Sequence, residues 1–194
     1  MKKAVFMDRD GVINPLVWNP KASSYDSPHQ PSEVSLLPGV PEALEKLARA
    51  GYLLIVVSNQ PSAAKGKCTL KDLENVHLSL NTLLQNAKQA KIEAFYYCYH
   101  HPEASYEPLK LKCECRKPGN LSLRQAQGKF NIRMEESWMI GDRDIDVLCG
   151  KSMRTRTVLL DYPYSRDQRN QNSADFCAAD LNEAAEWILT GRAS

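Results

Sequence analysis

The sequence predicts an α/β fold built on an open parallel sheet. Short, continuously apolar runs such as 4–7 and 52–57 are typical of strands that are buried on both faces of a parallel sheet. Stretches with helical spacing of apolar residues separate these runs, and such alternation favours this class. Several of the runs end directly in acidic or small polar residues, at the strand ends where these sheets bind ligands.

Length and composition limit the possible functions. A chain of 194 residues can bury a substantial core, and we expect residues 1–194 to form one domain and a monomer. The net charge of +2 gives no reason to expect nucleic acid or a membrane as a partner. The first apolar run stops at Asp8, too early for a signal peptide, and no run approaches the roughly 18 residues of a membrane span. These features predict a cytoplasmic protein.

The first strand leads into two carboxylates. Asp8 follows the apolar run at once, and Asp10 comes two residues later, before a turn at Gly11. Carboxylates this close repel each other, and a hard divalent cation such as Mg²⁺ supplies a counter-ion. The pair suits a covalent mechanism in which one carboxylate attacks phosphorus and the other transfers protons. A polar turn is the alternative interpretation of an isolated Asp-x-Asp.

The next segment is long and rich in proline. Residues 15–38 contain five prolines and are predicted to be irregular, with a position that fits a loop facing the substrate. A helix is expected from Pro38-Gly39, with apolar residues from Val40 to Leu47 on one face, and it ends at Gly51.

The second buried strand, 52–57, ends in Ser58-Asn59-Gln60. A serine hydroxyl and backbone N–H groups at this place can bind phosphate oxygens without adding charge, and a capped turn is the alternative. Thr69 and Asp72 then resemble a capping box at the start of a long helix, in which we expect His77 to be a packing residue. Residues 94–97 are a third candidate strand.

Two close pairs of metal-binding residues come next. Cys98 and His100 are followed about a dozen residues later by Cys113 and Cys115, which suits a tetrahedral, structural Zn²⁺ site that would staple the intervening loop. Reduced free thiols or a disulfide are the alternatives. We expect His101 to lie behind the ligands or to be free. The remaining cysteines are expected to pack as small hydrophobic residues, and they are Cys68, Cys149 and Cys177.

Basic residues follow the second cysteine pair directly. Lys117 is suited to neutralising a phosphoryl group and the Asp8–Asp10 pair, and Arg116 can grip substrate oxygens with two hydrogen bonds. Two basic residues before a helix are otherwise commonplace, so this interpretation depends on their position directly after the cysteine pair. A helix is predicted over 121–130.

The strand predicted at 138–140 leads into a second acidic cluster. Asp142 is a natural third protein ligand for Mg²⁺, beside Asp8 and the backbone carbonyl of Asp10. Asp146 lies four residues further on, on the same helix face, and can orient the metal's waters. The sequence also predicts a strand at 157–160, a loop at 161–173 and a closing helix at 181–190.

Taken in order, these strand-terminal motifs resemble those of the haloacid dehalogenase superfamily of aspartate-nucleophile phosphatases. The cysteine-histidine string before Arg116 resembles the branch of heptose-bisphosphate phosphatases and histidinol phosphatases. The resemblance implies a Rossmann-like sheet with helices on both faces and no large cap. It also implies Asp8 as the nucleophile, Asp10 as general acid and then base, and Mg²⁺ and Zn²⁺ as cofactors. Ser58 and Lys117 would stabilise the phosphoryl group, and the substrate-binding residues would be Asn59, Arg116 and Arg143.

We therefore expect a Mg²⁺-dependent phosphatase of a small phosphorylated metabolite, preferably D-glycero-D-manno-heptose 1,7-bisphosphate. Histidinol phosphate is the alternative substrate. A zinc-stabilised binding module with an inactive site is the alternative of another class. The chain departs from the family pattern at Pro61, which removes a backbone N–H near the phosphate site.

Overall fold

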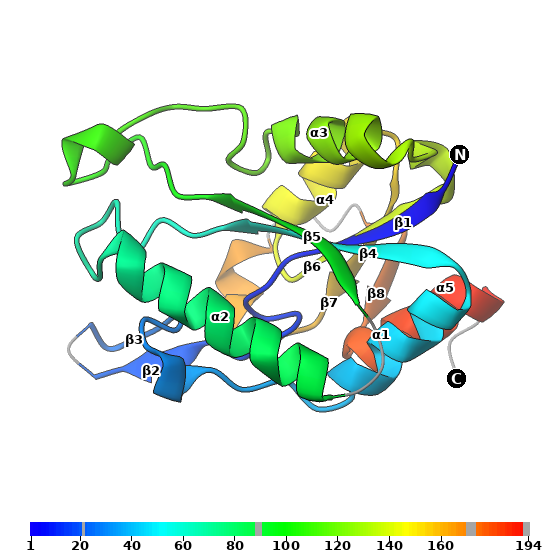
Figure 1. Ribbon diagram of the computed structural model, residues 1–194, viewed down its shortest axis with the longest axis horizontal. Coiled ribbons are helices and arrows are strands. Elements are labelled where there is room, and N and C mark those ends of the chain that lie inside the picture. The colour runs from blue at the N-terminus through cyan, green and yellow to red at the C-terminus, as the bar shows by residue number, and fades with distance from the viewer. Residues whose placement is uncertain (21, 88–90, 170–173, 192–194) are drawn as a thin grey trace.

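The computed structural model describes residues 1–20, 22–87, 91–169 and 174–191. A six-stranded sheet forms its centre, in the order β5-β4-β1-β6-β7-β8, and every neighbouring pair of strands is parallel (Figure 1). The strands are β1 (Lys3–Met7), β4 (Tyr52–Asn59), β5 (Ile92–Cys98), β6 (Trp138–Gly141), β7 (Arg156–Leu160) and β8 (Phe176–Ala178). This confirms the predicted fold class.

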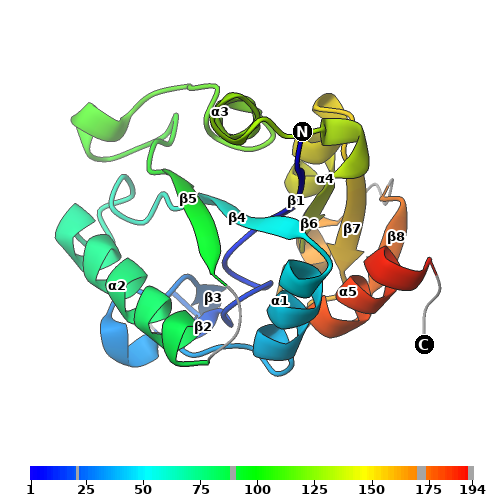
Figure 2. The ribbon, with the colours of Figure 1, turned by 45° about the vertical axis from the view of Figure 1, so that its right-hand side comes forward.

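Helices cover both faces of the sheet, as expected. One face carries α1 (Val40–Arg49), α2 (Leu70–Asn86) and α5 (Leu181–Thr190), and the other carries α3 (Leu121–Phe130) and α4 (Asp144–Ser152) (Figure 2). The capping box predicted for α2 is present, with the Asp72 N–H donating to the Thr69 hydroxyl at 3.1 Å. Within the described residues, none of these helices combines the length and apolar character needed to span a bilayer.

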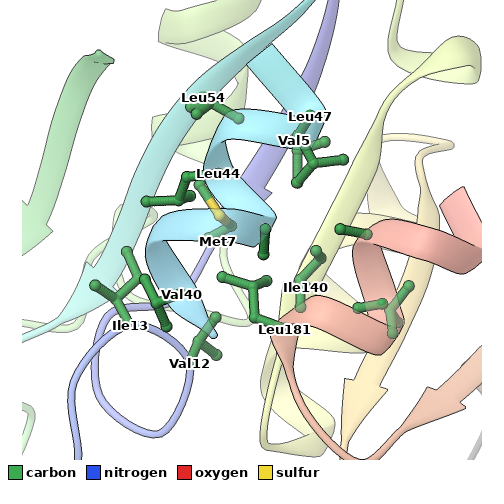
Figure 3. Packing of buried hydrophobic residues seen from close by; sticks show 14 of the residues in the cluster. Val5, Met7, Val12, Ile13, Val40, Leu44, Leu47, Leu54, Ile140 and Leu181 are labelled. Carbon is green, nitrogen blue, oxygen red and sulfur yellow. The ribbon is translucent and has the colours of Figure 1, made fainter. Parts of the chain in front are cut away.

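The core consists of two apolar layers, one on each side of the sheet. In β1, Val5 and Met7 face α1, while Phe6 packs against the opposite layer, so residues 4–7 are all buried. Figure 3 shows Val5 and Met7 beside Leu44 and Leu47 of α1. Burial on both faces explains why the strands have continuously apolar sequences, without the alternation of a half-exposed strand.

The strand order brings the polar strand ends together. From β1 the chain moves outward through β4 to β5, and it then returns to the other side of β1 with β6. The order therefore reverses at β1, which creates a crevice at the carboxyl ends of β4, β1 and β6. The residues that follow these three strands form the site described below.

The expectation that 15–38 is irregular was wrong in part. This segment contains an antiparallel hairpin of β2 (Val17–Asn19) and β3 (Ser24–Asp26), in which the Trp18 and Tyr25 rings meet edge to face at 5.2 Å, and the 3₁₀ helix η1 (Pro31–Glu33). Strands of three residues are too short to show the alternation of apolar and polar residues that marks a strand. The five prolines of the segment therefore favoured an irregular loop. The hairpin lies at the carboxyl end of the sheet, as does the segment between β5 and α3 (Figure 1).

Two smaller expectations also need correction. The segment predicted as a loop at 161–173 contains the 3₁₀ helix η4 (Pro163–Gln168), and its last residues, 170–173, lie outside the described part of the chain. Two further short 3₁₀ helices, η2 (Glu107–Leu109) and η3 (Met134–Glu136), precede β6.

Cys177 lies exposed on β8 and is not packed as a small hydrophobic residue, whereas Cys149 is buried. β8 is the last strand in the sheet order, so it has a neighbouring strand on one side only.

The contact between α1 and the sheet predicts a large stability effect. Leu47 is fully buried in this layer, so Leu47→Ala leaves a cavity and should lower the free energy of unfolding by about 2–5 kcal/mol. Leu78 on α2 is 52% exposed, and Leu78→Ala should change the free energy by less than about 0.5 kcal/mol. Urea denaturation of both variants measures the difference. Equal effects would contradict the packing described here.

Candidate active site

Three carboxylates gather at the carboxyl edge of the sheet. Asp8 follows β1, Asp142 follows β6, and Asp146 lies in the first turn of α4. One oxygen atom from each carboxylate lies within 4.8 Å of the other two, and all three side chains are buried. Burial disfavours the charged form, and the carboxylates Asp146 and Asp8 add repulsion, which raises the pKa of Asp142 to about 7. Burial is also the main reason that the pKa of Asp146 is raised to about 6.

Two glycines make this approach of carboxylates possible. A Cβ atom on Gly141 would lie 2.2 Å from Cβ of Asp146. A Cβ atom on Gly11 would lie 2.6 Å from Oδ2 of Asp142, and Gly11 also has a φ of +80° that other residues rarely adopt. The cluster therefore depends on the absence of side chains at positions 11 and 141.

Lys117 lies inside the acidic cluster. Its Nζ is 3.0 Å from Oδ1 of Asp8 and 2.6 Å from Oδ1 of Asp146, and it donates to the Val57 carbonyl at 2.7 Å. Burial alone would lower the pKa of Lys117, but Asp146 and Asp8 raise it above the ordinary value. Asn59 holds the lysine backbone in place, since its side-chain amide accepts from the Lys117 N–H at 2.9 Å and donates to the Lys117 carbonyl at 3.1 Å.

The Asp10 carboxylate accepts hydrogen bonds from four side chains. Oδ1 accepts from Arg9 Nε at 3.0 Å and from Asn14 Nδ2 at 2.9 Å, while Oδ2 accepts from Gln60 Nε2 at 2.7 Å and from Ser27 Oγ at 2.9 Å. Burial would raise the pKa of Asp10, but the Arg9 charge and the bonds from Asn14 and Gln60 hold it below its usual value. The carboxylate is therefore fixed in orientation and favoured in its ionised form.

Donor chemistry at the acidic cluster fits a hard divalent cation. Neither carboxylate oxygen of Asp142 has a hydrogen-bond partner among the described residues, although the side chain is fully buried. Arg143 Nε lies 3.8 Å from Asp142 Oδ2, too far for a hydrogen bond. Buried oxygens of this kind are the ligands that Mg²⁺ prefers. Asp146 is paired with Lys117 and accepts from the Arg143 N–H at 3.1 Å, so its effect on metal-bound water stays a prediction.

A pocket of about 300 Å³ opens above the carboxylates. Asp8 and Asp10 form its acidic floor, and its walls carry the cations Lys65, Lys67, Arg116 and Arg143. Three predicted substrate-binding residues, Asn59, Arg116 and Arg143, line this pocket, but the amide of Asn59 is already engaged by Lys117. Ser58 is buried, and its hydroxyl accepts from Gln60 Nε2 at 3.0 Å.

The predicted zinc ligands form a second cluster, outside the pocket. Pairs of the sulfur atoms of Cys98, Cys113 and Cys115 are 3.1–3.5 Å apart, and His100 Nδ1 lies 3.5 Å from the Cys115 sulfur. These separations exclude a disulfide, whose sulfur atoms are about 2.05 Å apart, and are compatible with a tetrahedral zinc site. His101 is not part of this cluster, and its Nδ1 accepts from the Glu103 N–H at 3.1 Å.

The thiols of the cluster have perturbed acidities. Burial, followed by hydrogen bonds with the other two cysteines, raises the pKa of Cys98. Burial opposes ionisation of Cys113 as well, but hydrogen bonds from Cys115 and Cys98 lower its pKa to about 7. One thiol of the set is therefore readily ionised, which favours metal binding.

Sequence reasoning missed all four side-chain partners of Asp10, which are Arg9, Asn14, Gln60 and Ser27. Arg9 is 1% exposed, and such a buried guanidinium requires a carboxylate partner, so its place between two aspartates was a usable signal. Gln60 directly follows the serine and asparagine that were singled out. Ser27 gave no signal, because only the hairpin brings it to Asp10.

Comparisons with known proteins agree with this geometry. Residues 114–184 match the family model described as HAD-hydrolase-like. The chain is 30% identical over 190 residues to the D-glycero-beta-D-manno-heptose-1,7-bisphosphate 7-phosphatase of Salmonella typhi, covering 98% of this chain and 91% of the relative. It is 33% identical over 159 residues to the enzyme of the same name from Haemophilus ducreyi, covering 82% of each chain.

A solved structure shares the fold. The D,D-heptose 1,7-bisphosphate phosphatase of B. bronchiseptica, in complex with magnesium and phosphate, superposes with a TM-score of 0.79. The match covers 98% of this chain and 99% of that chain at 22% sequence identity. At this identity the likeness supports the fold.

The acidic cluster predicts a specific response to Mg²⁺. Asp142→Asn removes one of three buried, repelling carboxylates, so the metal-free variant should melt at a higher temperature than the unaltered chain. Mg²⁺ should raise the Tm of the unaltered chain and leave that of Asp142→Asn unchanged, because a ligand has been lost. Calorimetry with EDTA and with Mg²⁺ measures both effects, and the exposed change Asp167→Asn is the control. A full Mg²⁺ response in Asp142→Asn would contradict the metal assignment.

Proposed function

The chain belongs to the haloacid dehalogenase-like phosphatases, and we propose that it removes the 7-phosphate of D-glycero-D-manno-heptose 1,7-bisphosphate in a Mg²⁺-dependent reaction. The relatives that share 30% and 33% identity with it over most of its length carry this activity in their names. The single observation that carries the chemistry is the position of Asp8 on the pocket floor, 3.0 Å from Lys117 Nζ and beside the buried carboxylates.

In the proposed mechanism, Asp8 attacks phosphorus and forms an aspartyl-phosphate while the bond to the sugar oxygen breaks. Asp10 gives a proton to that leaving oxygen and later takes one from the water that hydrolyses the intermediate. Lys117 and the Ser58 hydroxyl stabilise the negative charge on the phosphoryl group. The four donors around Asp10 favour the carboxylate form, which the second step requires. For the first step, a substrate bound as its phosphate monoanion brings the proton that Asp10 passes to the leaving oxygen.

Mg²⁺ would be held by Asp8, Asp142 and the backbone carbonyl of Asp10. When bound there, it neutralises carboxylate and phosphate charge and orients the phosphoryl group. Asp146 is paired with Lys117, so it holds the lysine ammonium group in place. It would also orient water molecules bound to the metal.

The charge of the pocket walls supports a substrate with two anionic groups. One phosphoryl group is served by Lys117 and the metal, yet four more cations line the pocket. Asp26 also lines the pocket and pairs with Lys67, so the anions of the wall balance only part of its positive charge. Burial, Lys67 and Arg116 lower the pKa of Lys65 by more than Asp26 and Glu103 raise it. A bisphosphate supplies that second anion, whereas histidinol phosphate carries an ammonium group instead.

We also propose a structural Zn²⁺ ion between Cys98, His100, Cys113 and Cys115. Four protein ligands leave no open position, which is the pattern of structural sites. Because Cys115 directly precedes Arg116 and Lys117, the ion would hold both cations at the pocket with little entropic cost.

The activity test is phosphate release with Mg²⁺ from both anomers of heptose 1,7-bisphosphate, from histidinol phosphate and from common sugar phosphates. We expect the highest kcat/KM for one heptose anomer. Asp8→Asn and Asp8→Ala should lower turnover at least about a thousandfold, because the nucleophile is lost. Glu135→Gln makes the same carboxylate-to-amide change at an exposed position and should keep full activity. Unchanged turnover in both Asp8 variants would refute the assignment of Asp8 as the nucleophile. A preference for histidinol phosphate would refute heptose bisphosphate as the substrate.

The zinc proposal has a separate test. The purified chain should contain about one zinc per molecule, and Cys115→Ser should lose the zinc and melt at a lower temperature, because an open ligand position weakens a structural site. Elemental analysis and calorimetry give the two readouts. Cys177→Ser changes an exposed cysteine outside the cluster and should retain the zinc. A Cys115→Ser protein with full zinc content would contradict the ligand set.

A further inference from the structure

One of the four side chains that bond to Asp10 comes from a different part of the fold. Arg9, Asn14 and Gln60 belong to the turns that follow β1 and β4, and none of them lines the pocket. Ser27 directly follows β3 of the hairpin and does line the pocket, and its hydroxyl donates to Oδ2 of Asp10 at 2.9 Å. Asp10 is thus held from below by the sheet edge and from the pocket side by the hairpin.

The hairpin is tied down on both sides of Ser27. Asp26 forms an ion pair with Lys67, and His29 Nε2 lies 3.0 Å from the Ser62 hydroxyl. Lys67 and Ser62 both belong to the segment after β4, so the two contacts fix Ser27 relative to the sheet edge. A hydroxyl fixed in this way loses little entropy when it binds the carboxylate.

A third contact secures the far side of the hairpin. The Tyr25 ring stacks on Tyr164 of η4, with ring centroids 3.7 Å apart. The residues around Ser27 are therefore attached to two separate segments at the pocket mouth, after β4 and after β7.

We propose that Ser27 is a positioning residue that aims the Asp10 carboxyl group at the leaving oxygen of the substrate. The inference rests on the proposed function, since it assigns Ser27 a part in the same reaction. Bonds from Arg9 and Asn14 to Oδ1 set one end of the carboxyl group. Gln60 and Ser27 hold Oδ2 together with a longer bond from Arg9 Nη2 at 3.2 Å, and Ser27 alone of these lines the pocket that the substrate enters.

The role can be separated from a structural one by the leaving group. A sugar alkoxide needs a proton as the phosphorus–oxygen bond breaks, whereas 4-nitrophenolate leaves without one. The ratio kcat/KM reports the steps up to that bond cleavage. A wrongly oriented Asp10 therefore lowers kcat/KM for hydrolysis of the sugar phosphate and leaves kcat/KM for the aryl phosphate unchanged.

The experiment compares Ser27→Ala, Ser27→Thr and the unaltered chain on the best sugar phosphate of the panel and on 4-nitrophenyl phosphate. We expect Ser27→Ala to lower kcat/KM for the sugar phosphate about tenfold, a fraction of what a general acid contributes. Its kcat/KM for the aryl phosphate and its inhibition constant for inorganic phosphate should stay within about twofold of those of the unaltered chain. Ser27→Thr keeps the hydroxyl and should therefore retain kcat/KM for the sugar phosphate. Ser24→Ala, an exposed change on the same hairpin, is the matched control and should behave like the unaltered chain.

Two results would overturn the positioning role. Equal losses on both substrates would show that Ser27→Ala disturbs the pocket as a whole, and unchanged rates on both would show that the hydroxyl is dispensable. Failure of the proposed function is visible separately, because the unaltered chain itself would then fail to release phosphate from the sugar phosphate.

Discussion

The structure depends on the enclosure of three carboxylates and one ammonium group at the end of the central strand. Asp8, Asp142 and Asp146 carry more negative charge than Lys117 can balance, and burying charge without compensation is costly. Asp142 and Asp146 are fully buried after β6 and in α4, and Asp8 after β1 meets solvent only through the pocket. The excess charge is what a divalent cation offsets, so the metal requirement follows from the arrangement of strands.

The surrounding features all serve this cluster. The reversal of strand order at β1 brings the ends of β4, β1 and β6 together, and glycines at positions 11 and 141 allow the carboxylates to approach. Asn59 fixes the Lys117 backbone from β4, while the cysteine cluster ends one residue before Arg116. The pocket walls add further cations that are not part of the cluster.

Most of this arrangement could be predicted because it is local in the sequence. A strand buried on both faces is apolar throughout, so Asp8 and Asp142 stand out at the ends of such runs. The cysteine pairs are close enough in the sequence to be recognised as candidate ligands. The hairpin could not be predicted, since three-residue strands show no period. Contacts made through it, such as Ser27 to Asp10, depend on the path of the segment between β1 and α1. The engagement of Asn59 by Lys117 was missed for the same reason, as the two are far apart in the sequence.

The hairpin has a consequence for how this enzyme can diverge. In many enzymes the loops that select a substrate are separate from the groups that perform the chemistry, so they can be exchanged with little effect on rate. Here one short segment supplies Tyr25 to the pocket wall and Ser27 to the Asp10 carboxylate. With the positioning role proposed for Ser27, insertions or replacements in this segment would alter selectivity and turnover together, which restricts the hairpin sequences that retain a working enzyme.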